Sequence, residues 1–217
     1  MMRVNLPEPL KPGSKIEFTM DWTFNIHDRM SFIGGRPGYE YFEKDGNYLY
    51  TMAEWFPRMA VYSDFQGWQN KQFMGKGEFA LTFGDYKVKI TVPADHMVGA
   101  TGVLQNPESV LNSVELKRWE EAKKSYDKPV IIRTQAEAEK LEKTRAKDKK
   151  TWIYHAENVR DFAWTSSRKL IWDAMAVKQR NRDVMAMSYY GKDGNPLWEQ
   201  YSTKVVAHTI KSYGAKT

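Results

Sequence analysis

The sequence predicts a mainly β protein, a saddle-like antiparallel β-sheet or sandwich domain with a helical insertion and a C-terminal helix. Three observations predict it. In the first hundred positions, apolar and polar residues alternate over several short segments, which is typical of half-buried strands. Between about 107 and 150 the alternation gives way to charged, helix-forming sequence. Strand patterns return after residue 150, and residues 197–213 have helical spacing again.

The clearest strand pattern lies at residues 15–24, where apolar and polar side chains alternate. The apolar members are Ile16, Phe18, Met20, Trp22 and Phe24. Farther along, Asp45-Gly46 predicts a hairpin turn ahead of an aromatic strand at 48–50. We expect both elements to belong to the sheet.

Two strands are predicted around Gly84, at residues 79–83 and 86–92. The second should end at Pro93, because proline has no N–H to donate to a strand ladder. A shorter strand is expected at 98–104, interrupted by two glycines.

The insertion, about 107–150, is predicted to hold two helices. The first runs over 107–125, and Thr134 is a good N-cap for the second, which we expect to continue to about residue 150. The apolar run 130–133 between them predicts a short strand.

The last third predicts strands at 151–156, 159–164 and 183–190, followed by a helix at 197–213. Four side chains of that helix recur at steps of three and four and share one face. They are Trp198, Tyr201, Val205 and His208.

The chain has 217 residues, enough for one large domain or two small ones. We expect one β domain over 1–195, with 196–217 forming a helix that leads into a further domain. The N-terminal residues lack the apolar core of a signal peptide, and no stretch approaches the ~18–20 apolar residues of a membrane helix. No membrane span is therefore predicted, and the compartment stays open.

The sequence lacks the motifs of several kinds of catalytic and metal-binding site. The sequence has no cysteine, which excludes disulfides, thiolate zinc sites and cysteine nucleophiles. Its four histidines are far apart, without the H-E-x-x-H spacing that places two zinc ligands on one helical face. No phosphate-binding loop or nucleophile elbow occurs either. We predict no catalytic residue, no metal ligand and no cofactor within this chain.

Nucleic-acid binding is not predicted. Residues 115–150 hold 12 Lys and Arg against 8 Asp and Glu, which places most of the net charge of +6 there. Acidic residues are interleaved with the basic ones, and a solvated helix with i,i+4 pairs is the commoner meaning of such a pattern. No nucleic-acid-binding motif accompanies the charge.

Five blocks of sequence are distinctive in order and spacing. They are EWFPRMAVYSD at 54–64, GW at 67–68, ITVPA at 90–94, LQNP at 104–107 and AENVRDFAW at 156–164. Together they resemble the amino-terminal domain of aminopeptidase N type zinc metallopeptidases (gluzincins), in particular a bacterial branch. The resemblance covers roughly residues 12–213.

The resemblance implies a non-catalytic β domain that forms one wall of a peptide-substrate cleft. In that family the next domain carries zinc, bound by H-E-x-x-H and a later Glu, and hydrolyses N-terminal peptide bonds. These motifs are not in the 217 residues, so the chain resembles a piece of a longer enzyme. The resemblance is compatible with an exported or periplasmic parent enzyme. Its expected partners are that catalytic domain and, in the parent enzyme, the peptide substrate. We expect an exposed apolar patch where the domains would meet, with helix 197–213 as the candidate.

The resemblance also implies roles for three residues. Glu54 is the nearest match to a family Gln or Glu that lines the first specificity subsite and helps to hold the free amine of the substrate. Arg58 and Asp64 match positions that lie near the crossing into the catalytic domain, and they are expected at the domain interface.

Two alternatives remain open. The chain is rich in tryptophan, so it could be a stand-alone module that binds a glycan or peptide through exposed Trp on one sheet face. The candidates are Trp22, Trp55, Trp68, Trp152, Trp164 and Trp172. The basic helices could instead make it an adaptor for anionic polymers, recognisable by salt-sensitive retention on heparin.

Overall fold

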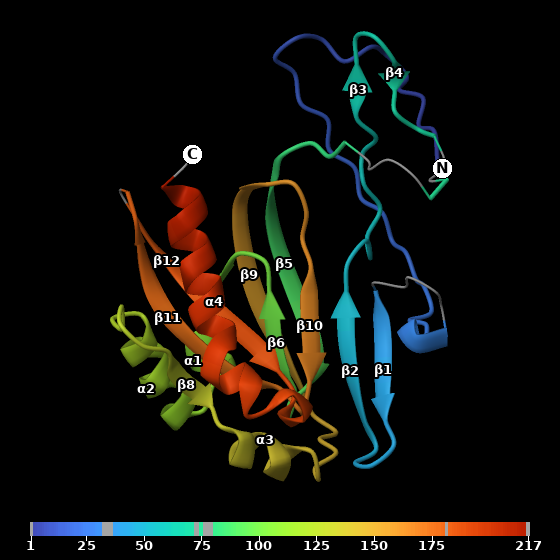
Figure 1. Cartoon of the computed structure of the whole chain (residues 1–217). Helices are drawn as coiled ribbons and strands as arrows, with labels where there is room; N and C mark the ends of the chain where they lie inside the picture. The colour runs from blue at the N-terminus through green and yellow to red at the C-terminus, as the bar shows by residue number, and fades with distance from the viewer. Residues whose placement is uncertain (1, 32–36, 72–73, 76–79, 181, 216–217) are drawn as a thin grey trace.

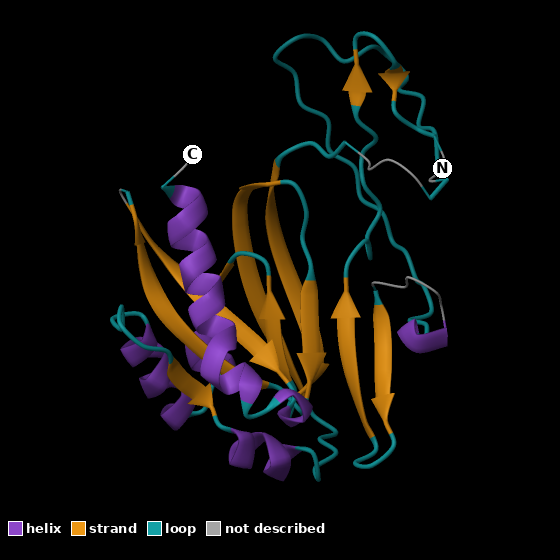
Figure 2. Cartoon of the chain, viewed as in Figure 1, coloured by secondary structure: helices purple, strands orange, loops and turns teal. Residues whose placement is uncertain are grey.

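A computed structural model describes residues 2–31, 37–71, 74–75, 80–180 and 182–215 of the chain. It confirms a mainly β fold, with 34% of residues in strands and 22% in helices. The strands form several antiparallel sheets, and a long C-terminal helix lies across one of them (Figures 1 and 2).

The first sheet has the strand order β1-β2-β10-β6. Its members are β1 (Gly38–Phe42), β2 (Asn47–Met52), β10 (Trp164–Ser167) and β6 (Met97–Ala100). The predicted turn at Asp45-Gly46 joins β1 to β2, and Gly46 has the positive φ of 64° that such a turn requires. The predicted aromatic strand at 48–50 lies within β2.

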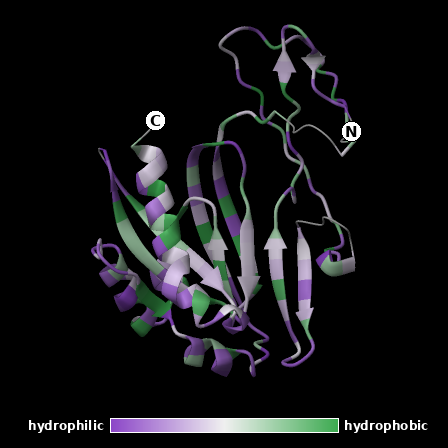
Figure 3. Cartoon of the chain, in the orientation of Figure 1, coloured by the Kyte–Doolittle hydropathy of each residue, from purple (hydrophilic) through white to green (hydrophobic). Residues whose placement is uncertain are grey.

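The second sheet has the order β5-β9-β7. Its strands are β5 (Gly84–Pro93), β9 (Lys149–Val159) and β7 (Val103–Leu104). Exposed and buried residues alternate along β5, and Figure 3 shows the matching alternation of hydropathy in this sheet. The predicted end at Pro93 and the predicted strand at 151–156 are both confirmed.

The third sheet has the order β12-β11-β8. It contains β8 (Val130–Arg133), β11 (Ile171–Gln179) and β12 (Arg182–Tyr190). A separate small hairpin, β3 (Tyr62–Ser63) and β4 (Gly67–Trp68), lies beside the N-terminal segment (Figure 1).

The helical elements are α1 (Pro107–Val110), α2 (Ser113–Ala122), α3 (Gln135–Leu141) and α4 (Leu197–Gly214), with 3-10 turns η1 (Arg29–Ser31) and η2 (Lys192–Gly194). Thr134 caps α3 as predicted, and Glu137 completes its capping box. The helix ends at Leu141 instead of near residue 150, because the basic residues that follow lead into β9. The helix predicted at 107–125 is two helices, since Asn112 starts a new capping box with Glu115.

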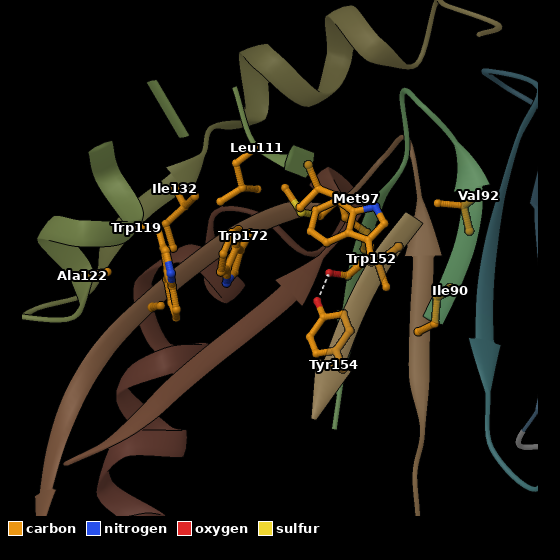
Figure 4. Packing of buried hydrophobic residues seen from close by; sticks show 14 of the residues in the cluster. Ile90, Val92, Met97, Leu111, Trp119, Ala122, Ile132, Trp152, Tyr154 and Trp172 are labelled. Carbon is orange, nitrogen blue, oxygen red and sulfur yellow. Dashed lines mark hydrogen bonds between the residues drawn. The ribbon is translucent and has the colours of Figure 1, made fainter. Parts of the chain in front are cut away.

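The core lies between the sheets and under α2. Trp152, Trp172 and Phe162 are its largest fully buried side chains. Trp172 packs between Trp119 of α2 and Tyr189 of β12, at ring-centroid distances of 5.1 and 5.3 Å. Figure 4 shows this cluster, together with the hydrogen bond of 2.8 Å from the Tyr154 hydroxyl to the carbonyl of Val98.

The strand predicted at residues 15–24 is wrong. This segment forms no β-ladder, and four of its apolar side chains are exposed. They are Ile16 (46%), Phe18 (61%), Trp22 (46%) and Phe24 (49%). Alternation states which side chains could share a face, but a strand also needs a neighbour for its N–H and C=O groups. None is present for this segment within the described residues.

Two further strand predictions are also wrong. Residues 80–83 are irregular, and Phe79 lies outside the described residues. Residues 160–163 form a turn between β9 and β10 instead of continuing a strand. The short strand predicted at 98–104 is divided between β6 and β7, because Gly102 turns the chain with a φ of 91°.

The helix α4 is confirmed, and the face that carries Trp198, Tyr201 and Val205 points outward. Thr203 and Ala207 are buried against β11 and β12, with Val206 and Ile210 packed beside them. The side chains of the opposite face are exposed, including Trp198 (46%), Tyr201 (54%) and Val205 (58%). The helix is therefore anchored, and it still presents the apolar stripe expected of a domain boundary.

A buried hydrogen-bond network fastens α4 to the sheet. The Asp173 carboxylate accepts from the hydroxyls of Tyr190 and Thr203, and the Ser188 hydroxyl lies 2.8 Å from the Thr203 oxygen, to which it can donate. Burial raises the pKa of Asp173 above its ordinary value, although these hydrogen bonds oppose the shift. In the described part of the chain, no helix is long and apolar enough to cross a membrane.

Candidate functional site

The predicted substrate-binding residue lies in a turn directly after β2, which we call the Glu54 turn (residues 53–58). The strand before it ends at Met52, which pairs with Trp164 of β10. Glu54 is exposed, and its backbone has a φ of 54°. A non-glycine residue in this left-handed region costs about 1–3 kcal/mol, and such strain is concentrated at functional sites.

Trp55 anchors this turn to the sheets. Its indole N–H donates to the carbonyl of Phe162 at 2.9 Å. Its ring lies 4.9 Å from Phe56, 6.5 Å from Phe162 and 6.4 Å from Trp164. Trp22 of the N-terminal segment adds a ring contact of 6.3 Å and donates its N–H to the carbonyl of Trp55. The backbone of the turn is thus held on both sides.

Arg58 joins the turn to the segment between β9 and β10. Its guanidinium forms an ion pair with Asp161 at 3.0 Å and donates to the carbonyl of Arg160. It also lies over the ring of Phe56 at 5.5 Å. The sequence block at 156–164 contains Asp161, but nothing in the linear sequence pairs it with a residue about a hundred positions earlier.

Asp64 is exposed in the turn between β3 and β4. No contact joins it to Glu54 or Arg58 in the described part of the chain. The structure therefore brings Arg58 and Glu54 into one turn and leaves Asp64 on the separate small hairpin.

No group of three or more His, Asp or Glu side chains suited to a metal ion occurs among the described residues. His155 pairs with exposed Glu157 on β9 at 3.8 Å, and His208 contacts Ser212 on α4 at 3.3 Å.

The tryptophans do not gather on one sheet face. Trp152 and Trp172 are buried in the core, and Trp55 and Trp164 are partly buried against it. Trp22 (46%) and Trp68 (56%) are exposed, the first on the N-terminal segment and the second on β4. The side chains proposed for a Trp platform are mostly committed to packing.

Sequence reasoning missed a buried polar cluster beneath the first sheet. The Nδ1 atom of His96 lies 2.8 Å from the Ser166 hydroxyl, and both residues are buried. Neighbouring Asp95 accepts from Arg168 at 2.8 Å, from Thr144 at 2.9 Å and from the N–H of Ala146 at 2.7 Å. Burial raises the pKa of Asp95, but these bonds outweigh it and hold the value at about 2.

His96 is predicted to make the fold acid-sensitive. Burial and the positive charge of Arg168 lower its pKa from 6.5 to about 4. The native state therefore keeps His96 neutral, while the unfolded chain takes up a proton near its ordinary pKa. Stability is present above about pH 6.5 and is lost as the pH falls toward 4.

Between about pH 7 and pH 5 we expect His96 to account for a loss of roughly 2 kcal/mol in unfolding free energy. Urea unfolding at both pH values measures the loss, and the His96→Gln variant should show a smaller difference. The surface variant His208→Gln is the control and should keep the slope of the parent protein. Equal slopes for all three proteins would contradict the assignment.

No family model, curated protein sequence or solved structure matches this chain.

Proposed function

We propose that this chain is a non-catalytic domain of a zinc-dependent aminopeptidase-like protein. It forms one wall of the substrate cleft and packs on a zinc-bearing catalytic domain, which is a separate part of the parent enzyme. The parent activity would be hydrolysis of N-terminal peptide bonds. Zinc would be bound by that partner domain, where it would activate water.

The observation that carries this proposal is the convergence of separate sequence blocks on the Glu54 turn. Residues 54–58 contact residues 160–164 through the Trp55 and Arg58 bonds. The turn between β6 and β7 reaches the same place, since Thr101 and Ala163 exchange hydrogen bonds of 3.0 and 3.1 Å. Two of the blocks that carry the resemblance, 54–64 and 156–164, thus meet beside the exposed Glu54, whose backbone is strained.

In this account, Glu54 receives the free α-ammonium group of a peptide substrate. A carboxylate that accepts hydrogen bonds from an ammonium group forms a charge-assisted interaction, stronger than a neutral one. The left-handed backbone of Glu54 supports the proposal, because strained backbone conformations are concentrated at functional sites, and the Trp55 bond holds the backbone of this turn in place.

Exposed apolar side chains supply surface for the catalytic domain. Along the outer face of α4 these are Leu197 (60%), Trp198, Tyr201 and Val205. A second group surrounds the small hairpin, with Met59 (63%), Tyr62 (63%), Phe65 (78%) and Trp68. Clusters of exposed apolar side chains are typical of surfaces that a partner covers. Asp64 lies in the second region and Arg58 in the Glu54 turn, and both are proposed as interface residues.

The proposal predicts the effect of Glu54→Gln in a polypeptide that includes the zinc domain. Loss of the charge-assisted bond should lower kcat/KM for substrates with a free N-terminus by about 10- to 100-fold, chiefly by raising KM. Steady-state hydrolysis of aminoacyl-anilides measures this change.

The matched control is Glu157→Gln, which removes an exposed carboxylate on β9 and should leave kcat/KM unchanged. An unchanged kcat/KM for Glu54→Gln would contradict the role of Glu54. Robust cleavage of aminoacyl-anilides by the purified 217-residue chain would contradict the larger proposal, because this chain is expected to be inactive alone.

A further inference from the structure

The hairpin of β1 and β2 carries four tyrosines on one face, which we call the tyrosine face (Tyr39, Tyr41, Tyr48 and Tyr50). The antiparallel register places Tyr39 opposite Tyr50 and Tyr41 opposite Tyr48. Side chains two positions apart on a strand point to the same side, so both cross-strand pairs lie together.

The four rings form one continuous cluster with Tyr48 at its centre. The Tyr48 ring lies 4.8 Å from Tyr41, 5.3 Å from Tyr39 and 6.1 Å from Tyr50. Its plane is tilted by 40° to Tyr41 and by 22° to Tyr50, while Tyr39 meets it edge-on. Because the rings pack on one another, they present a surface on which a ligand can stack. They leave no gap between them of the kind that holds the proline rings of a proline-rich peptide.

This surface is open on the outer side of the sheet. Tyr41 is 46% exposed and Tyr48 39% exposed, while Tyr39 and Tyr50 are half-buried. Toward the centre of the sheet the same face is closed, since Ser166 of β10 pairs with Tyr50 and is fully buried. The tyrosine face is therefore exposed on one side and borders the buried core on the other.

The hydroxyl groups of the four tyrosines distinguish the tyrosine face from an ordinary apolar interface. None of them forms a hydrogen bond with another described residue. Tyr154 and Tyr190, by contrast, donate their hydroxyls to protein acceptors. A ligand that covers the tyrosine face must therefore offer hydrogen-bonding groups of its own. Without them, binding would remove water from the phenol groups and leave them unpaired.

The arginines near the tyrosine face are engaged within the chain. Arg168 is paired with Asp95 at 2.8 Å, and Arg29 is paired with Glu40 at 2.6 Å on the opposite face of the hairpin. The guanidinium of Arg145, beside Gly46, has no carboxylate partner among the described residues and donates to the backbone carbonyls of Glu142 and Gly46. Because these cations are engaged by groups of the chain itself, an uncharged ligand is favoured over a nucleic acid or an acidic peptide.

We propose that the tyrosine face binds a neutral oligosaccharide. The apolar C–H faces of the sugar rings would stack on Tyr41 and Tyr48, and the sugar hydroxyls would pair with the free phenol groups. Tyrosine suits this use because it offers a large, rigid, amphipathic contact area at little cost in conformational entropy. The site lies on β1 and β2, and it functions whether or not a zinc domain is present.

The test is an NMR titration of the 217-residue chain with cellohexaose, a neutral chain of β-1,4-linked glucose whose rings form a flat ribbon. Saturable shifts of the tyrosine ring signals are expected. Tyr48→Ala should weaken binding by about tenfold, the equivalent of one lost stacking contact. Tyr48→Phe keeps the ring and removes the hydroxyl, so its loss should be smaller.

Tyr62→Ala is the matched control, because Tyr62 is an exposed tyrosine that contacts Trp68 on the separate hairpin. It should leave cellohexaose binding unchanged. If the amide signals of β1 and β2 show that Tyr48→Ala disturbs the hairpin, Tyr41→Ala replaces it and should weaken binding similarly. The proposal is overturned by an absence of saturable shifts, by binding that survives the Tyr48 and Tyr41 changes, or by salt-sensitive binding of oligothymidylate in place of the sugar.

Discussion

Replacing Lys169 with methionine is expected to lower the free energy of unfolding by about 3 kcal/mol, because it leaves the Asp45 carboxylate without its cation. Glu142 keeps Lys192 as its one remaining cation partner among the described residues. The Lys169 side chain is 2% exposed. Its ammonium group pairs with Asp45 at the β1–β2 turn and with Glu142, just after α3, at 3.2 Å. It also lies 4.5 Å from the centre of the Phe42 ring. One buried lysine thus joins the hairpin, the end of the insertion and β10.

The pKa of Asp45 agrees with this role. Burial raises it, but the hydrogen bonds from Lys169 and Asn47 outweigh the burial and leave the pKa below its ordinary value. The ionised carboxylate is therefore the native form. The loss of stability is measured by urea unfolding of Lys169→Met near neutral pH.

Lys123→Met is the matched control, since Lys123 also forms an ion pair, with Glu120 at 2.6 Å, but is 41% exposed. Its effect should stay below about 1 kcal/mol, as for other surface pairs. The triple variant Lys169→Met, Asp45→Asn, Glu142→Gln should regain part of the stability, because it no longer buries unpaired charges. Equal effects of the two lysine variants would contradict a buried ionic link.

Replacing Trp55 with alanine is expected to destabilise the protein by about 3 kcal/mol, near the lower end of values for truncated aromatic residues in cores. The variant loses the ring contacts to Phe56, Phe162 and Trp164 and the hydrogen bond to the carbonyl of Phe162. The same change should release the backbone of the Glu54 turn, which those contacts hold. Thermal and urea unfolding measure the first effect, and amide hydrogen exchange at residues 53–58 measures the second.

Trp68→Ala provides the comparison, because Trp68 is 56% exposed and meets the ring of Tyr62 on its own hairpin edge-on. We expect a loss below about 1 kcal/mol and no change in exchange at the Glu54 turn. A Trp55→Ala protein as stable as Trp68→Ala would show that Trp55 does not anchor the turn.

Most elements are predicted correctly where the sequence pattern indicates a strand or helix and the folded chain supplies the neighbours that this element needs. The hairpin at Asp45-Gly46, the strand ending at Pro93 and the N-cap at Thr134 each depend on local chemistry, and each is found. The segment 15–24 has an equally regular pattern but no strand beside it. Pairing is a property of the whole fold, so alternation alone could not predict its absence.

The outward face of α4 illustrates the same limit. Spacing correctly groups Trp198, Tyr201 and Val205 on one side of the helix, but it does not state which side packs. The sheet accepts the smaller residues Thr203 and Ala207, because Thr203 reaches Asp173 and alanine allows a close approach. The larger side chains remain outside, where they form the surface proposed for the catalytic domain.

The candidate site was partly accessible from sequence. Resemblance directed attention to Glu54 and Arg58, and both lie in one turn. The left-handed backbone of Glu54 and the partner of Arg58, Asp161, could not be predicted, because each depends on contacts between segments far apart in the chain. The tyrosine face was likewise not predicted. The carbohydrate hypothesis considered only the tryptophans, and most of these are buried.

The coding sequence beyond the Thr217 codon tests most directly whether this chain is a domain of a zinc aminopeptidase-like enzyme. We expect an open frame that encodes H-E-x-x-H and, farther on, a glutamate placed as a third zinc ligand. A stop codon directly after Thr217, or a continuation without these ligands, would contradict it.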